Sequence, residues 1–212
     1  TINELDVNNV QISTLRAVRH NCSLKCSSLL QAVSDLDNTY PIIAFIDADT
    51  VVHPNWLREL VTPLIDDRVG LTTGNRWYVP TGKYWGSLVR YSGNIATVVQ
   101  MFLFQIPWGG TLAIKTEVLN RINLLDKWGE VLTDDMLLHK LLKKEKLQIK
   151  CVPSLLMLNR EESSLPNVLN SLKRLIIGSK LYHPRWLAIV SEAYSSIVVP
   201  NVVIIFIFHL LF

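Results

Sequence analysis

Three short segments of the sequence hold residue types that could perform chemistry. Asp47 and Asp49 stand two positions apart after an apolar run, and residues 108–111 read Trp-Gly-Gly-Thr. Asp134 and Asp135 then follow as an adjacent pair of acids. Carboxylates bind hard divalent cations, and a well-placed carboxylate can also take a proton from a hydroxyl group. These segments therefore indicate a site for a phosphorylated or hydroxyl-bearing substrate.

The first acid pair follows a run that is typical of a buried strand. Residues 41–46 are almost wholly apolar, as in a strand covered on both faces. On an extended backbone, residues i and i+2 point to the same side, so Asp47 and Asp49 are expected to converge at the strand's carboxyl end. Ligands bind at that end of open α/β sheets, and magnesium sites often combine one or two carboxylates with substrate phosphates. The alternative is two solvated aspartates in a turn between a strand and a helix.

The second acid pair is expected at the start of a helix. Thr133 can cap this helix, with Asp134 and Asp135 in its first turn and lysines near its last. Acids are favoured in a first turn, so the pair could serve only to cap the helix. As a base, Asp135 would need Asp134 and a negative substrate to raise its pKa against the helix dipole.

The remaining apolar pattern predicts a chain of mixed helices and strands. Val7, Val10 and Ile12 hint at a strand, and residues 35–38 are expected to form a turn. Helices are predicted over residues 24–33, 56–64, 84–104 and 116–125. Further strands are predicted over residues 69–74, 112–114, 147–152 and 155–158.

Composition limits the classes of function. The chain has 212 residues, is 49% hydrophobic and carries a net charge of +3, with a mean hydropathy of +0.25. This small charge gives no argument for nucleic acid, but it suits a protein near an anionic membrane surface. Cys22, Cys26 and Cys151 are odd in number and form no C-x-x-C, which indicates reduced thiols in the cytosol and argues against a zinc site. Because the sequence begins at Thr1, we expect it to be a piece of a longer protein.

The C-terminal segment is the most apolar part of the sequence. Only Pro200, Asn201 and His209 interrupt residues 197–212. A spanning helix needs about 20 apolar residues, so this segment predicts the first part of a transmembrane helix, with Trp186 and Tyr194 at the membrane interface. The alternative is a buried core helix.

The order of the three chemical segments resembles that of the family 2 glycosyltransferases, which have a GT-A fold. The likeness is closest to the membrane-bound branch that includes ceramide glucosyltransferase and similar bacterial enzymes. Residues 25–29, Lys-Cys-Ser-Ser-Leu, also resemble a lysine-containing segment of that branch. The resemblance covers roughly residues 20–186. It implies a Rossmann-like mixed sheet flanked by helices, in a catalytic domain over residues 1–186 that lacks its first nucleotide-binding strands. Residues 187–212 would be the membrane segment.

The resemblance also implies a reaction and roles for individual residues. The reaction would be inverting transfer of a sugar from a nucleotide donor, UDP-linked by expectation, to a lipid or another hydroxyl acceptor. The catalytic domain would face the cytoplasm. Asp49 would bind Mn²⁺ or Mg²⁺ directly, with Asp47 at the ribose or behind the metal. Asp135 would be the general base, supported by Asp134. The expected donor contacts also include Lys25 and Arg174, and the expected sugar or acceptor contacts are Trp108, Gly109, Gly110 and Thr111.

One family signature is degraded in this chain. The family has Q/R-x-x-R-W beyond the base, where this chain has Ser171 to Leu175; Arg174 matches only the arginine. The segment 182–186 supplies Arg185 and Trp186, but it lies too far along the chain. Two other readings stay open at this point. The protein could be a sugar nucleotidyltransferase on a related fold, or a catalytically inactive remnant anchored at a membrane.

Overall fold

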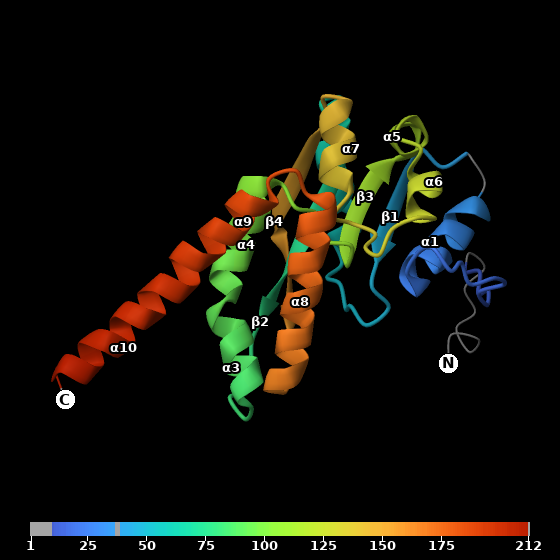
Figure 1. Cartoon of the computed structure of the whole chain (residues 1–212). Helices are drawn as coiled ribbons and strands as arrows, with labels where there is room; N and C mark the ends of the chain where they lie inside the picture. Colours follow the sequence, from blue (N-terminus) through green and yellow to red (C-terminus); the bar gives the residue numbers. More distant parts are fainter. Residues whose placement is uncertain (1–9, 37–38, 212) are drawn as a thin grey trace.

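The computed structural model describes residues 10–36 and 39–211 (Figure 1). Within them, four strands form a mixed sheet in the order β1-β3-β2-β4. Strand β3 runs antiparallel to β1 and β2, whereas β2 and β4 are parallel. The carboxyl end of β1 therefore lies beside the amino end of β3, where Ile46 pairs with Thr111. The strands are β1 Ile42–Ile46, β2 Val69–Tyr78, β3 Thr111–Lys115 and β4 Gln148–Asn159.

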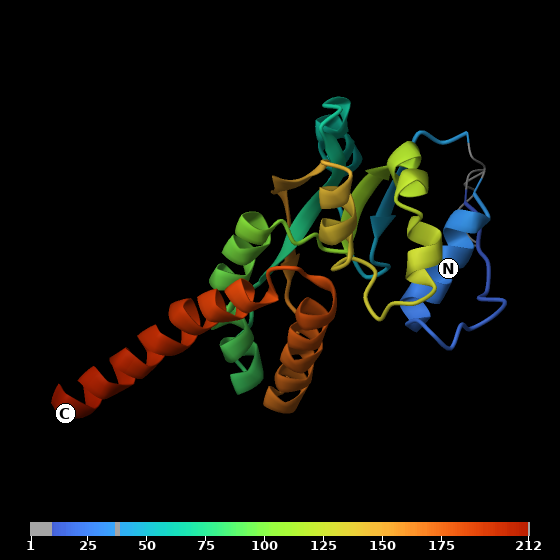
Figure 2. The same ribbon diagram turned by 45° about the horizontal axis from the view of Figure 1, so that its top comes forward.

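Helices flank the sheet, which confirms the predicted α/β class with a mixed sheet (Figures 1 and 2). Successive side chains of β3 point to opposite faces of the sheet and so pack into two separate apolar clusters. Leu112 and Ile114 pack into a cluster with α1 and α5 to α7, whereas Ala113 packs with α2. The helices are α1 Leu24–Ser34, α2 Trp56–Val61, the 3₁₀ turn η2 Thr62–Ile65, α3 Trp85–Ser92, α4 Asn94–Phe104, α5 Thr116–Arg121, α6 Leu124–Trp128, α7 Leu138–Lys144, α8 Leu165–Tyr182, α9 Trp186–Ala193, the π-helical η3 Tyr194–Val198 and α10 Val199–Leu211.

The predicted strand before the first acid pair is present, but two expectations about it were wrong. Strand β1 pairs with β3 and is a terminal strand of the described sheet. Its side chains are not all buried as expected, because Ile43 is buried but Ile46 is exposed. The chain turns directly after β1, because the N–H of Thr50 donates a hydrogen bond to the Asp47 carbonyl at 3.0 Å. The backbone is therefore not extended from Asp47 to Asp49, so the reason for expecting both side chains on one side does not hold.

The helix expected from Thr133 begins later. Helix α7 starts at Leu138, so Asp134 and Asp135 lie in an irregular segment before it, and the Thr133 hydroxyl caps nothing. Tertiary contacts explain this difference. The indole Nε1 of Trp128 donates a hydrogen bond to the Asp134 carbonyl at 2.9 Å, and the Asp135 carboxylate accepts one from a loop outside the segment. The predicted opposition between a helix dipole and the Asp135 pKa therefore does not arise.

Most other predicted elements are confirmed, with shifted bounds. The segment 84–104 forms two helices that meet at Gly93, and residues 116–125 also divide between two helices. The two strands predicted after α7 are one continuous strand, β4. Val10 and Ile12 lie outside any strand, whereas Val7 and residues 37–38 of the expected turn fall outside the described residues.

The C-terminal segment is helical from Trp186 to Leu211, with a π-helical stretch in its middle. Helix α9 contacts α4 and α8, and α10 extends away from the sheet (Figure 1). Among the described residues, no helix combines the length and the apolar character needed to cross a bilayer. The transmembrane helix expected within residues 187–212 is therefore not found.

Candidate active site

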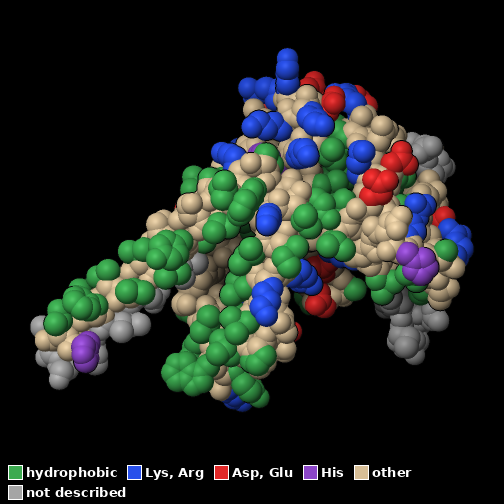
Figure 3. All heavy atoms as spheres, in the orientation of Figure 1, with side chains coloured by type: hydrophobic (Ala, Val, Ile, Leu, Met, Phe, Trp, Pro, Cys, Tyr) green, Lys and Arg blue, Asp and Glu red, His purple; other side chains and the backbone are tan. Residues whose placement is uncertain are grey.

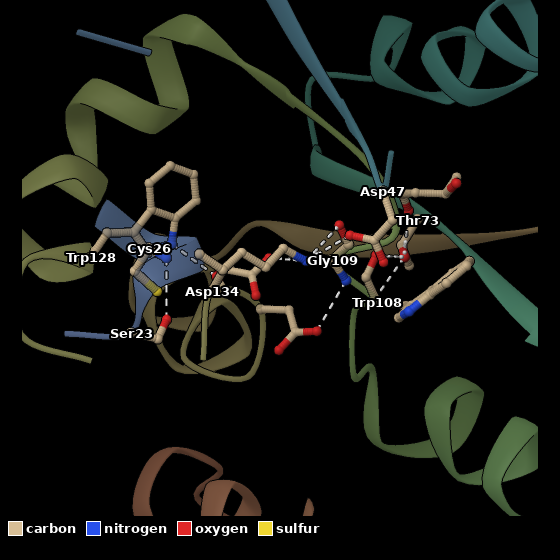
Figure 4. Close-up of polar contacts among 11 residues, drawn as sticks. Ser23, Cys26, Asp47, Thr73, Trp108, Gly109, Trp128 and Asp134 are labelled. Carbon is tan, nitrogen blue, oxygen red and sulfur yellow. Dashed lines mark hydrogen bonds and ion pairs between the residues drawn. The ribbon is translucent and has the colours of Figure 1, made fainter. Parts of the chain in front are cut away.

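Lys25 connects the separate acidic segments, of which Figure 4 labels Asp47 and Asp134. The Ser23 hydroxyl caps α1 by accepting a hydrogen bond from the N–H of Cys26, which places Lys25 in the first turn. Its Nζ lies 2.9 Å from Asp47 Oδ1 and 3.2 Å from Asp134 Oδ2. It also donates a hydrogen bond to the Gly109 carbonyl at 3.4 Å. We call Lys25, Asp47, Gly109, Asp134 and Asp135 the acid cluster.

The ammonium group of Lys25 stays charged in this setting. Burial lowers the Lys25 pKa, but Asp134 and Asp47 raise it by more, so the net pKa lies above the usual value. One cation thus faces two nearby carboxylates before any ligand is considered. The cluster has a net negative charge that favours a cationic or hydroxyl-bearing ligand.

Thr73 fixes the loop that carries residues 108–111. Its buried hydroxyl accepts a hydrogen bond from the N–H of Trp108 at 2.9 Å and lies 3.1 Å from the Thr111 carbonyl. The loop also joins the end of β1, because the N–H of Asp47 donates to the Gly110 carbonyl at 3.2 Å. The sequence analysis missed this residue, because a threonine in a strand that also holds Thr72, Asn75 and Arg76 gives no distinct signal.

The two loop glycines allow protein groups to come unusually close. A Cβ on Gly109 would overlap with Asp134 Oδ2 and lie 3.2 Å from Lys25 Nζ. A Cβ on Gly110 would overlap with the Trp108 ring and lie 2.7 Å from Asp47 Oδ2. The sequence-based explanation was close approach of a sugar or acceptor. In the structure, the side chains that approach these glycines are carboxylates of the acid cluster and the Trp108 indole.

Asp135 has the most perturbed acidity in the acid cluster. Its Oδ2 accepts a hydrogen bond from the Gly109 N–H at 3.0 Å. Burial first, and then the Asp134 charge, raise the pKa of Asp135 to about 6, against the smaller effects of the Gly109 N–H and Lys25. A carboxylate with a pKa near neutrality can hold or release a proton under working conditions, as a general base must.

Arg76 and Trp128 are further residues at the site that the sequence analysis missed. The Arg76 guanidinium lies over the Trp108 ring at 5.8 Å and over the Tyr78 ring at 5.3 Å. Trp128 holds the Asp134 backbone, as described above. An arginine at the carboxyl half of a buried strand was a sequence signal for the first. The second depends on a contact that sequence spacing does not reveal.

Two predicted site residues are not joined to the acid cluster. Asp49 is exposed in the turn after β1, and Arg174 is exposed on α8. In residues 10–36 and 39–211, no hydrogen bond or ion pair links either side chain to the cluster. The predicted Thr111 lies in β3 with its Oγ1 buried and without a hydrogen-bond partner. The described part of the chain also contains no group of three or more histidine, cysteine or acidic residues arranged to hold a metal.

Comparison with known proteins gives a family match. The model of a family described as "Glycosyltransferase like family 2" matches residues 5–178. No curated protein sequence matches the chain.

Among solved structures, the chain is similar to glucosyl-3-phosphoglycerate synthase from Mycobacterium tuberculosis. Its complex with Mn²⁺ and UDP-glucose is 17% identical, with a TM-score of 0.39, over 72% of this chain and 51% of that one. Its complex with Mn²⁺, UDP-glucose and phosphoglyceric acid is 15% identical, with a TM-score of 0.36, over 80% and 53%. The chain thus spans about half the length of these structures.

Proposed function

Because the chain belongs to the glycosyltransferase-like family 2, we propose that it transfers a sugar from a nucleotide-sugar donor to a hydroxyl acceptor, with Asp135 as the general base. The family match agrees with the class of enzyme predicted from the sequence. The observation that carries the proposal is the position of Asp135, which lies beside Asp134 in the acid cluster with its pKa raised to about 6.

The proposed reaction is a single in-line displacement. Asp135 accepts the proton of the acceptor hydroxyl as that oxygen forms a bond to the anomeric carbon. The bond from the anomeric carbon to the donor's diphosphate oxygen breaks, and the diphosphate leaves with the electron pair. This displacement inverts the configuration of the sugar. Asp134 supports the base by raising its pKa, and the Gly109 N–H orients its carboxylate.

We propose Asp49, which lies in the turn after β1, as a ligand for a divalent metal. A single carboxylate can suffice on the protein side, since magnesium sites are commonly completed by phosphates and water. Asp47 already pairs with Lys25, whereas Asp49 is exposed. A bound Mn²⁺ or Mg²⁺ would offset the negative charge on the diphosphate. Lys25 and Arg76 supply further positive charge on the protein side of the site.

Substitution of Asp49 tests this assignment. In the complete protein, Asp49→Asn should abolish the metal-dependent part of UDP binding, because an amide is a weaker ligand for a hard cation than a carboxylate. Isothermal titration of UDP with and without Mn²⁺ measures this. Asp67→Asn, an exposed aspartate near β2, is the matched control and should bind as the wild type does. If Asp49→Asn retains metal-dependent UDP binding, Asp49 is not the ligand.

We further propose that the acceptor is a lipid or another hydroxyl compound at a membrane, and that the catalytic domain faces the cytoplasm. Exposed apolar side chains on α3, α8 and α10 support the membrane part of this proposal. Figure 3 shows hydrophobic side chains along α10 and at the ends of α3 and α8. The exposed residues include Trp85, Leu169, Leu172, Ile176, Val203, Phe206 and Leu210. Contact with lipid would remove this surface from water.

The family match disfavours a sugar nucleotidyltransferase. An assay separates the proposed transferase from the other alternative, a catalytically inactive remnant anchored at a membrane. A catalytically inactive remnant would bind membrane without turning over a donor. Metal-dependent hydrolysis of UDP-sugars by the purified complete protein would favour the transferase, whereas the absence of any turnover would favour the remnant. Asp135→Asn provides the control for contaminating activity.

A further inference from the structure

A cavity of about 360 Å³ lies apart from the acid cluster, between α7, the start of β4, the end of α4 and the start of α9. Its volume falls in the range of roughly 300–1,000 Å³ that is common for small-molecule sites. No residue of the acid cluster lines it. Its apolar walls come from Leu103, Leu142, Leu147 and Ile149, and its polar lining comes from Gln105, His139, Lys143 and Arg185.

His139 brings an unused polar group to this cavity. The side chain is buried, with 4% of its surface exposed, and neither ring nitrogen has a hydrogen-bond partner among the described residues. Burial, and then neighbouring His183, lower the His139 pKa to about 4, although the backbone of Gln105 opposes this slightly. The ring is therefore neutral at physiological pH and offers one N–H donor. Buried polar groups normally have a partner, and the ring nitrogens of His139 are also closed to solvent, so the ring forms a neutral, buried part of the cavity wall.

His183 differs from His139 in having both nitrogens engaged. The backbone N–H of Arg185 donates to His183 Nδ1 at 3.2 Å, so the proton lies on Nε2, which donates to the Phe104 carbonyl at 3.1 Å. The two imidazoles pack with their centroids 4.5 Å apart. This packing fixes the His139 ring beside the cavity.

The charges around the cavity favour an anion. Lys143 lies one helical turn after His139 on α7 and shares its face. The Arg185 guanidinium lies over the Phe104 ring at 5.1 Å and makes one long hydrogen bond to the Leu103 carbonyl at 3.5 Å, so most of its N–H groups stay available. None of the described lining residues carries a carboxylate. Figure 3 shows Lys and Arg side chains gathered over α7, which adds to the positive potential.

We propose that this cavity binds a phosphate ester that carries an apolar group. The phosphate would accept hydrogen bonds from Lys143 and Arg185, since guanidinium and ammonium groups match phosphate oxygens in charge and geometry. The apolar group would lie against Leu103 and Leu147, the lining residues whose apolar side chains are at least partly exposed. A lipid headgroup and a free phosphorylated compound share this chemistry. The site is independent of the proposed sugar transfer.

Calorimetry with phenyl phosphate and inorganic phosphate tests the site in the full chain, with EDTA present to exclude divalent metal. Phenyl phosphate should bind more tightly than inorganic phosphate, because only it reaches the apolar walls. Lys143→Gln and Arg185→Gln should each weaken phenyl phosphate binding by about tenfold or more, the usual loss for a hydrogen bond to a charged group. Lys144→Gln changes the next lysine on α7, which does not line the cavity, and should leave binding unchanged.

Three results would overturn the proposal. They are the absence of phenyl phosphate binding, equal binding of the two probes, and unchanged binding in Lys143→Gln. If Lys25→Gln instead abolishes binding, the probe occupies the acid cluster and the proposal also fails. NMR gives a second measurement in the wild type. A bound phosphate should raise the pKa of His139, because a nearby anion favours the charged imidazole, and an unchanged His139 titration would contradict the site.

Vesicles distinguish the two sources of the phosphate ester. Binding to phosphatidylcholine vesicles that contain phosphatidic acid is compared with binding to phosphatidylcholine alone. If Lys143→Gln lowers the phosphatidic acid-dependent part and Lys144→Gln does not, the ligand is a lipid headgroup. If both variants bind vesicles as the wild type does while Lys143→Gln loses phenyl phosphate, the ligand is a soluble ester.

Discussion

At the scale of single residues, the site depends on how one carboxylate is surrounded. Asp135 keeps its Gly109 hydrogen bond, but burial and the neighbouring Asp134 both disfavour its charge. Lys25 partly offsets this by bridging Asp134 and Asp47. The structure thus holds an acid that is costly to ionise in the absence of ligand. Functional carboxylates are commonly perturbed in this way.

The cost of ionising Asp135 should appear in the pH dependence of stability. Its pKa of about 6 in the folded state lies above the unfolded value of about 3.9. Ionisation therefore destabilises the fold progressively as the pH rises through this interval, and the full penalty is present above pH 6. Relative to the wild type, Asp135→Asn should gain on the order of 1–2 kcal/mol between pH 4.5 and 7.5. Urea unfolding without divalent metal measures this change.

An exposed acid gives the control of opposite sign. Hydrogen bonds from Arg68 lower the pKa of Asp66 to about 2, so its ionised form stabilises the fold above its unfolded pKa, and this is lost at acid pH. Asp66→Asn should therefore lose stability relative to the wild type as the pH rises from about 2 to about 4, the interval between the folded and unfolded pKa values. If Asp135→Asn shows the same direction as Asp66→Asn, the carboxylate is not destabilised by its surroundings.

At the scale of elements, the loop 106–110 joins the acidic segments. The Gly110 carbonyl of this loop accepts a hydrogen bond from the N–H of Asp47, and the Gly109 N–H donates one to the Asp135 carboxylate. The Trp108 N–H donates one to the Thr73 hydroxyl. Its glycines bring its backbone against the carboxylates, so the loop and the acids form one packed unit. Changes in the loop should therefore act on stability and on transfer together.

Gly109→Ala tests this packing. The added Cβ would overlap with the Asp134 carboxylate, so that carboxylate or the loop must move, at a cost of about 1–3 kcal/mol. Sugar transfer should fall as well, since the Gly109 N–H orients Asp135. The measurement is a double-mutant cycle of unfolding free energies. Asp134→Ala removes the atoms in conflict, so Gly109→Ala should cost less in that background; equal costs would contradict the close approach.

The sequence predicted most of the elements, because their apolar periodicity is strong. It placed β1, β2, β3 and the helix carrying Lys25, together with the order of the three chemical segments. It failed at Asp134 and Asp135, where local propensity favours a helix start but the Trp128 indole and the Gly109 N–H hold an irregular segment. It also failed after β1, where a turn replaces the extended backbone. Such tertiary contacts leave no periodic signal.

At the scale of the whole molecule, the apolar surface is unevenly distributed. The acid cluster lies at one end of the sheet, whereas α3, α8 and α10 expose hydrophobic side chains (Figure 3). Along α8, Leu165, Leu169, Leu172 and Ile176 are exposed and recur at helical spacing. An apolar surface of this extent is typical of a protein or membrane interaction site. Attachment to a membrane through these helices would hold the active site close to a lipid acceptor.

Membrane attachment predicts a specific pattern of losses. Phe206→Asp with Leu210→Asp should reduce co-sedimentation with phosphatidylcholine vesicles by about tenfold or more, because each buried apolar side chain is worth roughly 1.5–3 kcal/mol. Leu57→Asp on α2 is the matched control, since Leu57 is also exposed but lies on another helix. Equal sedimentation of all variants and the wild type would show that α10 does not contact lipid.

The proton acceptor is the central claim, and it is tested by the rate of sugar transfer in the complete protein. Asp135→Asn retains the size of the side chain and an acceptor for the Gly109 N–H but removes the basic carboxylate. It should slow transfer by on the order of 10²-fold or more while donor binding stays nearly intact. Asp134→Asn should cost less, because that residue only tunes the base. If Asp135→Asn transfers sugar at a near-normal rate and Asp134→Asn is inactive, the two roles are reversed and the account is contradicted.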